Sequence, residues 1–272
     1  MTSAACPPLG RVIGHRGAAA RAPENTLVGF RKAKALGCTA VEFDVRLTAD
    51  GALVLCHDPD LDRTTTGHGR VSAQTLAAIR TCDAGIRFDR AFTGEPVPTL
   101  DEALMLAVEL DVTANIEIKA DRGRDYATAA AVAATLGRLH GRIGPVLVSS
   151  FLPRAVAAMR SLAPEVPRSL LYRLVPRGWA EMASRLGCSA IGTDHRRLRS
   201  LRVAEIRAAG YPLLAYTVNN PMRARLLLDW GVTSVFSDAP DIILRGAVGD
   251  QPAWHRASVV YSAVGSGQGS IR

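Results

Sequence analysis

The chain has 272 residues and a mass of 28.9 kDa, which suits either two average domains or one large α/β barrel. Its 48% apolar and 21% charged residues are typical of a globular protein and exclude a disordered or collagen-like chain. The longest apolar stretches, such as 103–108, fall far short of the roughly 18 residues of a membrane-spanning helix.

The net charge is +8, and 30 of the 33 basic residues are arginines. A compositional bias towards arginine is the simpler explanation, and a functional basic surface is the alternative. The segment 154–225 nevertheless carries 13 arginines against four acidic residues, a local charge of +9, while the rest of the chain is about neutral. Such a surface can attract phosphate-bearing ligands, an anionic membrane surface (a weak contact) or nucleic acid. Nucleic acid is disfavoured, because no aromatic-rich RNA motif, zinc finger or basic helix accompanies the charge.

The cellular compartment is indicated by two features. Residues 1–14 contain two prolines and no apolar segment of the kind found in signal peptides. The five cysteines are scattered, odd in number and without metal-ligand spacing, which favours a reducing compartment over a disulfide framework. We therefore expect a cytoplasmic protein.

Short strand-like runs alternate with helical patterns along most of the chain. The strand-like runs cover 11–14, 40–46, 115–119, 146–151, 169–172, 189–193, 213–218 and 233–237. The helical patterns cover 26–36, 100–110, 126–140, 153–162, 179–186, 204–209 and 221–230. Several helical patterns end at a glycine, as helices commonly do. Eight such units predict an α/β protein with a single (β/α)8 TIM barrel over 11–246, after an N-terminal extension 1–10 and before a disordered tail 247–272. The first strand has no dinucleotide-binding fingerprint after it, which disfavours an open doubly wound sheet.

Two segments interrupt this alternation. After the second strand-like run, Asp50-Gly51 leads directly into the apolar run 52–57, with no room for a helix. Asp-Gly between apolar runs is a strong hairpin signal, so 52–57 is expected to pair antiparallel with the second strand and to place His57 beside Asp44. The stretch 58–98 is polar, with one short helix expected near 72–79, and we interpret it as an insertion at the barrel mouth.

Charged residues inside two strand patterns are the most informative feature. Because side chains alternate along a strand, Glu42 and Asp44 are predicted to face the barrel axis, and Glu117 does the same in the next strand-like run. Buried carboxylates cannot stay ionised without cationic partners. Oxygen ligands of this kind suit Mg²⁺ or Ca²⁺ better than zinc. The alternative is an internal salt-bridge network that uses Arg46 and Lys119.

Two histidines are expected at the same end of the barrel. His15 and Arg16 follow the first strand between two glycines, and His57 closes the hairpin strand. Two histidines beside a metal can act as a general acid–base pair, although a single histidine at a barrel rim is more often structural. Lys119, an inward-facing lysine in an arginine-rich chain, provides a compact ammonium group. Together with Arg16 it could hold the oxygens of a phosphodiester.

These residues form an ordered set of motifs that resembles the glycerophosphodiester phosphodiesterase family. In chain order the motifs are GHRG at 14–17, PENT at 23–26, EFDV at 42–45, DG at 50–51, HD at 57–58, LDRTT at 61–65, NIEIK at 115–119, SSF at 149–151 and TVN at 217–219. The resemblance covers residues 12–244, nearly the whole expected barrel.

The resemblance implies a barrel of the phospholipase-C-like type, in which the polar stretch after the hairpin matches the family's characteristic insertion. It also implies a divalent metal, Mg²⁺ or Ca²⁺, on Glu42, Asp44 and Glu117. His15 and His57 would then be the acid and the base.

The same resemblance assigns the phosphate to Arg16 and Lys119 and makes Phe151 and Tyr216 candidates for the wall of the substrate site. Two positions depart from the family's usual pattern. Tyr216 stands where a tryptophan is common, and VFSD at 235–238 replaces the more usual IITD. Neither departure removes a catalytic group, but the first could alter the wall that receives the glycerol or the leaving alcohol.

The function implied is metal-dependent hydrolysis of a small-molecule glycerophosphodiester to glycerol 3-phosphate and an alcohol, through a cyclic phosphate. The nearest alternative is a lysophospholipase D or a sphingomyelinase-D-like activity on the same fold. An alternative of another class is a non-catalytic binding barrel, against which the presence of all seven expected site residues argues. The sequence does not specify an oligomeric state, the native metal or the leaving alcohol.

Overall fold

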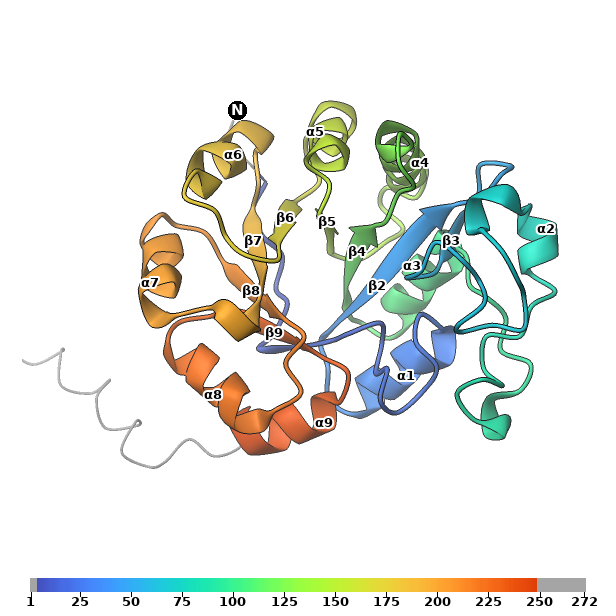
Figure 1. The fold of residues 1–272 in the computed structure, drawn as a ribbon, viewed down its shortest axis with the longest axis horizontal. Helices are drawn as coiled ribbons and strands as arrows, with labels where there is room; N and C mark the ends of the chain where they lie inside the picture. Colours follow the sequence, from blue (N-terminus) through green and yellow to red (C-terminus); the bar gives the residue numbers. More distant parts are fainter. Residues whose placement is uncertain (1–3, 249–272) are drawn as a thin grey trace, which may run out of the picture.

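The computed structural model describes residues 4–248, and within them eight parallel strands close into a barrel (Figure 1). Neighbouring strands follow the order β1-β9-β8-β7-β6-β5-β4-β2, and pairing of β1 with β2 closes the ring. The barrel predicted from the sequence is confirmed, and each predicted strand overlaps one of these eight. The bounds, with β3 as the added antiparallel strand, are β1 Val12–Gly14, β2 Ala40–Leu47, β3 Leu53–Leu55, β4 Thr113–Ile118, β5 Val146–Ser150, β6 Arg168–Tyr172, β7 Ala190–Asp194, β8 Leu213–Tyr216 and β9 Ser234–Ser237.

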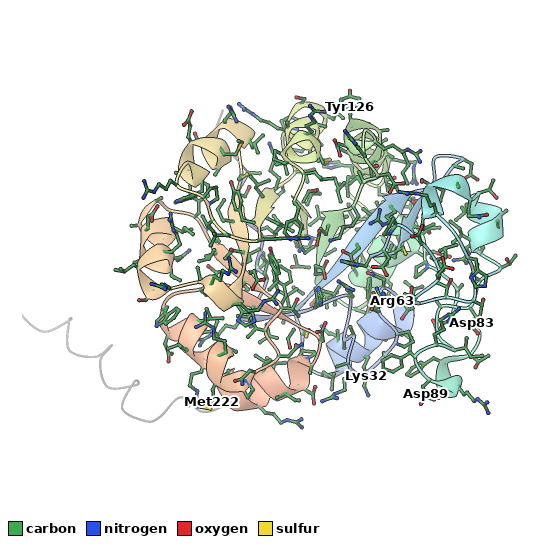
Figure 2. All side chains as sticks on the ribbon, viewed as in Figure 1. Lys32, Arg63, Asp83, Asp89, Tyr126 and Met222 are labelled. Carbon is green, nitrogen blue, oxygen red and sulfur yellow. The ribbon has the colours of Figure 1, made fainter. Side chains whose placement is uncertain are left out.

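Helices surround the barrel, and polar side chains such as Lys32 extend from them (Figures 1 and 2). Among those that link the strands, α7 begins four residues before its predicted start. Leu201 in its first turn is exposed, and Val203 is its first buried residue, so the apolar pattern marks the buried face rather than the helix start. The bounds are α1 Leu27–Ala35, α3 Leu100–Glu109, α4 Asp125–Arg138, α5 Pro153–Leu162, α6 Trp179–Leu186, α7 Ser200–Ala208, α8 Pro221–Asp229 and α9 Pro240–Ile243, the last continuing into the helical turn Leu244–Val248.

Strand β2 shows how packing orients the interior. Val41, Phe43 and Val45 are fully buried in the apolar layer between barrel and helices, where the Phe43 ring lies 5.0 Å from that of Phe30 on α1. Because side chains alternate along a strand, the acidic residues between them point to the barrel axis. The hydrophobic layer therefore fixes which way the charged side chains face.

The β2–β3 hairpin forms as predicted, but its register differs by one residue from the expected one. The Cys56 amide donates to the Asp44 carbonyl at 3.1 Å, so Cys56 rather than His57 lies opposite Asp44. The cause is the connection, which has five residues rather than a two-residue Asp-Gly turn. Thr48 closes it, donating its amide to the Ala52 carbonyl at 2.9 Å.

The insertion 58–98 contains short elements around a small apolar cluster of its own. The single helix expected near 72–79 is divided, because Gln74 is extended and Thr75 caps the second half. The elements are η1 Val71–Ala73, α2 Leu76–Ile79 and η2 Arg90–Phe92. The cluster includes residues of β3 and its end, so it attaches the insertion to the hairpin; its members are Val54, Cys56, Leu61, Val71, Ile79, Ala84 and Val97.

The two ends of the chain differ in how much is described. Leu9 of the N-terminal extension is buried against Ile13, Leu147 and other interior residues at the start of the strands. Of the predicted disordered tail 247–272, the structure describes Ala247 and Val248 at the end of the last helical turn, and the remainder lies outside the described residues. In the described part of the chain, the helices lack the length and apolar character needed to cross a bilayer.

Gly17 allows the loop after β1 to lie against α1. Its φ is +89°, and a Cβ there would lie 2.7 Å from the carbonyl carbon of Gly29; Gly94 has a φ of +93° but open space around it. We expect Gly94→Ala to cost about 1 kcal/mol of unfolding free energy from backbone strain. Gly17→Ala should cost at least about 1 kcal/mol more, because crowding adds to the strain. Chemical denaturation measures both, and equal losses would contradict a role for close approach.

Candidate active site

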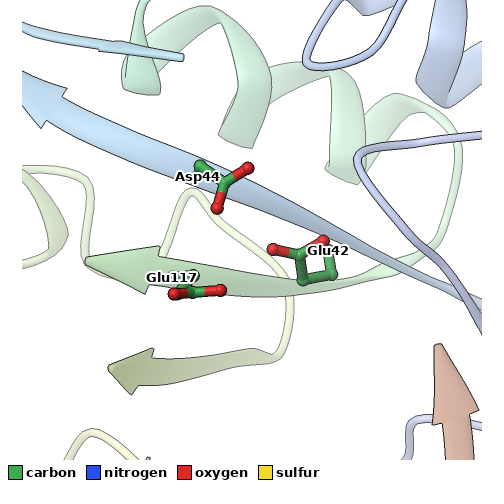
Figure 3. A group of neighbouring side chains, drawn as sticks. All are labelled: Glu42, Asp44 and Glu117. Carbon is green, nitrogen blue, oxygen red and sulfur yellow. The ribbon is translucent and has the colours of Figure 1, made fainter. Parts of the chain in front are cut away.

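Three carboxylates meet inside the barrel (Figure 3). Glu42 and Asp44 come from β2 and Glu117 from β4, and the parallel register places Asp44 directly opposite Glu117. One oxygen of each side chain lies within 4.8 Å of the others, and all three residues are buried. The three metal ligands suggested by the sequence are therefore brought together.

Asp44 is the carboxylate that the surrounding cations neutralise. Its Oδ2 lies 3.3 Å from Arg16 Nε, and its Oδ1 lies 3.4 Å from Lys119 Nζ. Burial acts to raise the pKa of Asp44, but the charges of Lys119 and Arg16 outweigh it and lower the pKa below its usual range. Asp44 is therefore ionised.

For the two glutamates, the nearby positive charges do not outweigh burial. Burial and the charge of Asp44 raise the pKa of Glu42 to about 7 and that of Glu117 to about 8, although Lys119 Nζ lies 2.5 Å from Glu117. Among the described residues, the buried Oε1 of Glu42 has no hydrogen-bond partner. A buried oxygen without a partner within a set of carboxylate donors fits a hard divalent cation.

The first histidine is oriented by a carboxylate from the last strand's end. His15 Nδ1 lies 2.6 Å from Asp238 Oδ1, and Asn219 donates to the other oxygen of Asp238 at 2.7 Å. The opposite ring nitrogen lies 3.9 Å from Glu42. Burial opposes a charge on His15, but the hydrogen bond to Asp238 and the charge of Glu42 outweigh it and raise the pKa of His15.

The second histidine has an equivalent arrangement on the hairpin. His57 Nδ1 lies 2.7 Å from Asp58 Oδ1, and the His57 carbonyl accepts from Arg46 Nη2 at 2.7 Å. Burial lowers the pKa of His57, and the charges of Arg16 and Lys119 add to this effect. Arg46 itself pairs with Asp121, in the loop between β4 and α4, and not with the central carboxylates. The part that the alternative salt-bridge network gave to Arg46 is therefore wrong.

Sequence reasoning assigned no role to several residues that hold the site. Asn25 and Asp44 are joined by two hydrogen bonds of 3.0 Å. The Asn25 side-chain amide donates to the Asp44 carboxylate, and the Asp44 backbone amide donates to Asn25 Oδ1. Glu24 accepts from Arg16 Nη1 at 2.9 Å, and the Arg16 amide donates to Glu42 at 3.0 Å. Glu24, Asn25, Asp58 and Asn219 all stand in the motifs. Asp58 adjoins its partner His57 in the sequence, but the other three contact residues 8 to 19 positions away, and spacing gave no signal for those contacts.

The candidate site residues line a pocket of about 150 Å³ at the barrel mouth. All the candidate site residues except the more deeply placed Asp44 contribute to it. Its lining is His15, Arg16, Glu42, His57, Asn115, Glu117, Lys119, Ser149, Phe151, Leu171, Tyr216, Thr217 and Phe236. A wider groove of about 400 Å³ shares His57, Glu117, Lys119 and Phe151 with it and extends to Arg173. Together they form an inner chamber with an open extension.

Two aromatic rings form one wall of this pocket. Phe151 and Tyr216 meet edge to face with centroids 5.5 Å apart, and Lys119 Nζ lies 5.3 Å from the Phe151 centroid. The Tyr216 hydroxyl donates to the Tyr172 carbonyl at 2.6 Å, which fixes the ring. The tyrosine that departs from the family's usual tryptophan is therefore held rigidly beside the cationic residues.

Comparison of the chain with known protein families, sequences and structures identifies its relatives. The profile of the glycerophosphoryl diester phosphodiesterase family matches residues 15–242. A glycerophosphodiester phosphodiesterase of Bacillus subtilis is 33% identical to the chain, over 85% of the chain and 84% of its own length. A glycerophosphodiester phosphodiesterase of Caldanaerobacter subterraneus is 32% identical, over 86% of the chain and 96% of its own length. An Oleispira antarctica phosphodiesterase, solved with the product sn-glycerol-3-phosphate, is 35% identical with a TM-score of 0.86, over 89% of this chain and 98% of its own.

The fold and the polar barrel mouth thus define a barrel hydrolase of phosphoric diesters. The chain belongs to the glycerophosphoryl diester phosphodiesterase family. It is therefore an enzyme and not a non-catalytic binding barrel.

The contact between Asp238 and His15 gives a direct test of the site's electrostatics. Asp238→Asn keeps the shape of the side chain but removes the negative charge that stabilises the imidazolium. We expect the pKa of His15 to fall, because burial then acts with less opposition. Titration of the His15 ring by NMR measures the change, with His68, which pairs with Asp62 in the insertion, as an internal reference. An unchanged His15 pKa would show that Asp238 does not set its charge.

Proposed function

We propose that the enzyme hydrolyses glycerophosphodiesters to glycerol 3-phosphate and an alcohol. The observation that carries this proposal is the arrangement around the inner pocket, where two aspartate-oriented histidines, two cations and three carboxylates converge. The Oleispira phosphodiesterase with bound sn-glycerol-3-phosphate supports the same product class. An enzyme with these products would act in glycerol and lipid metabolism. Five free thiols support a cytoplasmic location.

Glu42, Asp44 and Glu117 would hold the metal, Mg²⁺ or Ca²⁺. When bound, the ion supplies positive charge that stabilises the phosphoryl oxygens. The donor set supports this assignment, because it consists of carboxylates of which two have raised pKa values in the protein alone. A cation would compensate both glutamates.

Arg16 and Lys119 would bind the substrate phosphate. Each already contacts Asp44, which holds the two cations on either side of that carboxylate. Both line the inner pocket, so their remaining N–H groups can donate to phosphate oxygens. Phe151 and Tyr216 would form the wall against which the carbon skeleton of the substrate packs.

His15 and His57 would act as the acid–base pair. In the proposed reaction, one histidine accepts the proton of the glycerol 2-hydroxyl while that oxygen bonds to phosphorus. The P–O bond to the alcohol then breaks, and the leaving oxygen takes a proton from the other histidine. Water opens the cyclic phosphate with the roles reversed. The opposite directions of the two pKa shifts support one charged and one neutral histidine, as such a pair requires.

A second candidate function is lysophospholipase D activity, which is favoured by the open groove. Besides charged residues, the groove is lined by five apolar or aromatic residues, which offer contact to an acyl chain: Pro59, Ile118, Ala120, Phe151 and Leu152. Comparing the turnover of lysophosphatidylcholine with that of glycerophosphocholine distinguishes the two functions, because a lysophospholipase D hydrolyses the former.

Metal removal tests the role of the carboxylates. We expect excess chelator to abolish turnover and Mg²⁺ or Ca²⁺ to restore it. Glu117→Gln should weaken cation binding at least about tenfold in calorimetry, because one charged ligand is lost from a buried set. Glu109→Gln, at an exposed carboxylate on α3, is the control and should bind normally. Full activity in chelator would remove the metal from the mechanism.

The role of His57 is separated from a structural role by substitution. A positioned proton donor or acceptor contributes typically 10²–10⁴-fold in rate, so His57→Ala should lose about that factor in kcat with little change in melting temperature. His68→Ala, at an exposed histidine of the insertion, should keep full activity. A His57→Ala protein that loses stability while its folded fraction turns over normally would identify His57 as a packing residue.

Attack by the neighbouring hydroxyl is tested with a modified substrate. A well-oriented internal nucleophile is worth an effective molarity of about 10⁵–10⁸ M. A glycerophosphodiester without the glycerol 2-hydroxyl should therefore bind but turn over at least about a hundredfold more slowly. Steady-state kinetics of both substrates give the ratio, and comparable rates would mean that water attacks phosphorus directly.

A further inference from the structure

Three aliphatic side chains are unusually exposed at one side of the barrel mouth. The exposed fractions are 59% for Leu174, 84% for Leu201 and 81% for Met222. Leu174 follows the end of β6, and the other two are the second residues of α7 and α8 (Met222 is labelled in Figure 2). In a (β/α)8 barrel these positions belong to the face where the strands end, which is also the face of the catalytic pocket.

Two of these side chains share one hollow, and the start of α8, which carries Met222, is attached beside it. Leu174 and Leu201 line the same surface hollow of about 390 Å³. Arg223, the neighbour of Met222, donates to the Leu198 carbonyl at 2.9 Å, which holds the start of α8 against the loop before α7. We call this surface, formed by the loops after β6 and β7 and the first turns of α7 and α8, the rim.

The rim carries positive charge that is not balanced locally. Arg173, Arg177, Arg197 and Arg199 are exposed on its loops, and within residues 4–248 none of them forms an ion pair with a carboxylate. The nearby acids are already engaged, since Asp194 pairs with Arg196 and Glu205 with Arg202. The basic segment recognised in the sequence therefore concentrates free arginines on the same face as the exposed aliphatic side chains.

We infer that the rim binds the surface of an anionic lipid bilayer. Aliphatic side chains that project among arginines match a bilayer interface, where they enter the headgroup–acyl boundary while the guanidinium groups meet lipid phosphates. A surface that binds single-stranded nucleic acid exposes aromatic rings on which bases stack. The exposed apolar residues of the rim are aliphatic instead. The charge and the side-chain type together favour lipid.

Docking through the rim would leave the catalytic pocket open beside the membrane. Arg173 of the rim also lines the outer groove, together with His57 and Lys119 of the catalytic site. Arg173 thus connects the rim to the outer groove of the catalytic site. With a few arginines and three aliphatic side chains, the binding is weak and reversible, and it weakens as ionic strength rises.

Co-sedimentation with vesicles tests this inference. The whole chain should bind vesicles of 30% phosphatidylglycerol in phosphatidylcholine, bind pure phosphatidylcholine much less, and release with added salt. Arg197→Glu should weaken binding at least about fivefold, from the contribution of one arginine near an anionic surface. Leu201→Asp should weaken it at least about tenfold, because the variant loses an exposed leucine side chain that would be buried in the bilayer on binding.

Matched controls lie at the opposite face. Arg142→Glu, in the loop between α4 and β5, and Leu162→Asp, at the end of α5, change the same residue types and should bind as the unmodified chain. Binding is read without turnover, so the outcome is independent of the proposed reaction. Equal losses in rim and control variants, no preference for phosphatidylglycerol, or binding of duplex RNA without vesicle binding would overturn the inference.

Discussion

The mutual repulsion of three carboxylates is the constraint on which the rest of the site depends. Two unit charges 4.8 Å apart repel by about 3 kcal/mol at an effective dielectric constant near 20, and the barrel interior holds three such groups. The protein compensates one of them, Asp44, with Arg16 and Lys119. The two glutamates are left with raised pKa values, which makes their surroundings favourable for a cation.

The scaffold around these charges is assembled by closure of the barrel. Asp238 follows the last strand, yet it orients His15 at the end of the first, because β9 pairs with β1. Asn25, ahead of α1, reaches Asp44 in β2 because β1 pairs with β2 and the β1–α1 loop lies at the barrel mouth. The histidines and carboxylates thus keep their geometry only in the closed fold, which couples stability of the barrel to the chemistry of its mouth.

The sequence predicted the parts of the site that follow from local periodicity. Because side chains alternate along a strand, the pattern in β2 predicted that Glu42 and Asp44 face the barrel axis. The same reasoning predicted this orientation for Glu117 in β4. It did not give the hairpin register around His57, because a five-residue connection replaces the two-residue turn that Asp-Gly indicates. The partner of His15, Asp238, also depends on strand closure, which no local pattern encodes, whereas Asp58 adjoins His57 in the sequence. The eight strands were predictable because each is a short strand-like run and most of them lie between helical patterns.

Anomalous diffraction from crystals soaked with Mn²⁺, an ion that prefers the same oxygen ligands as Mg²⁺, tests the central claim most directly. We expect one strong peak within coordination distance of Glu42, Asp44 and Glu117, with Lys119 displaced from Glu117 relative to its 2.5 Å contact in the protein alone. The peak should be lost in Glu117→Gln crystals. A fully occupied Mn²⁺ bound elsewhere, with the three carboxylates still paired only to Arg16 and Lys119, would contradict the metal site and leave an internal salt-bridge network in its place.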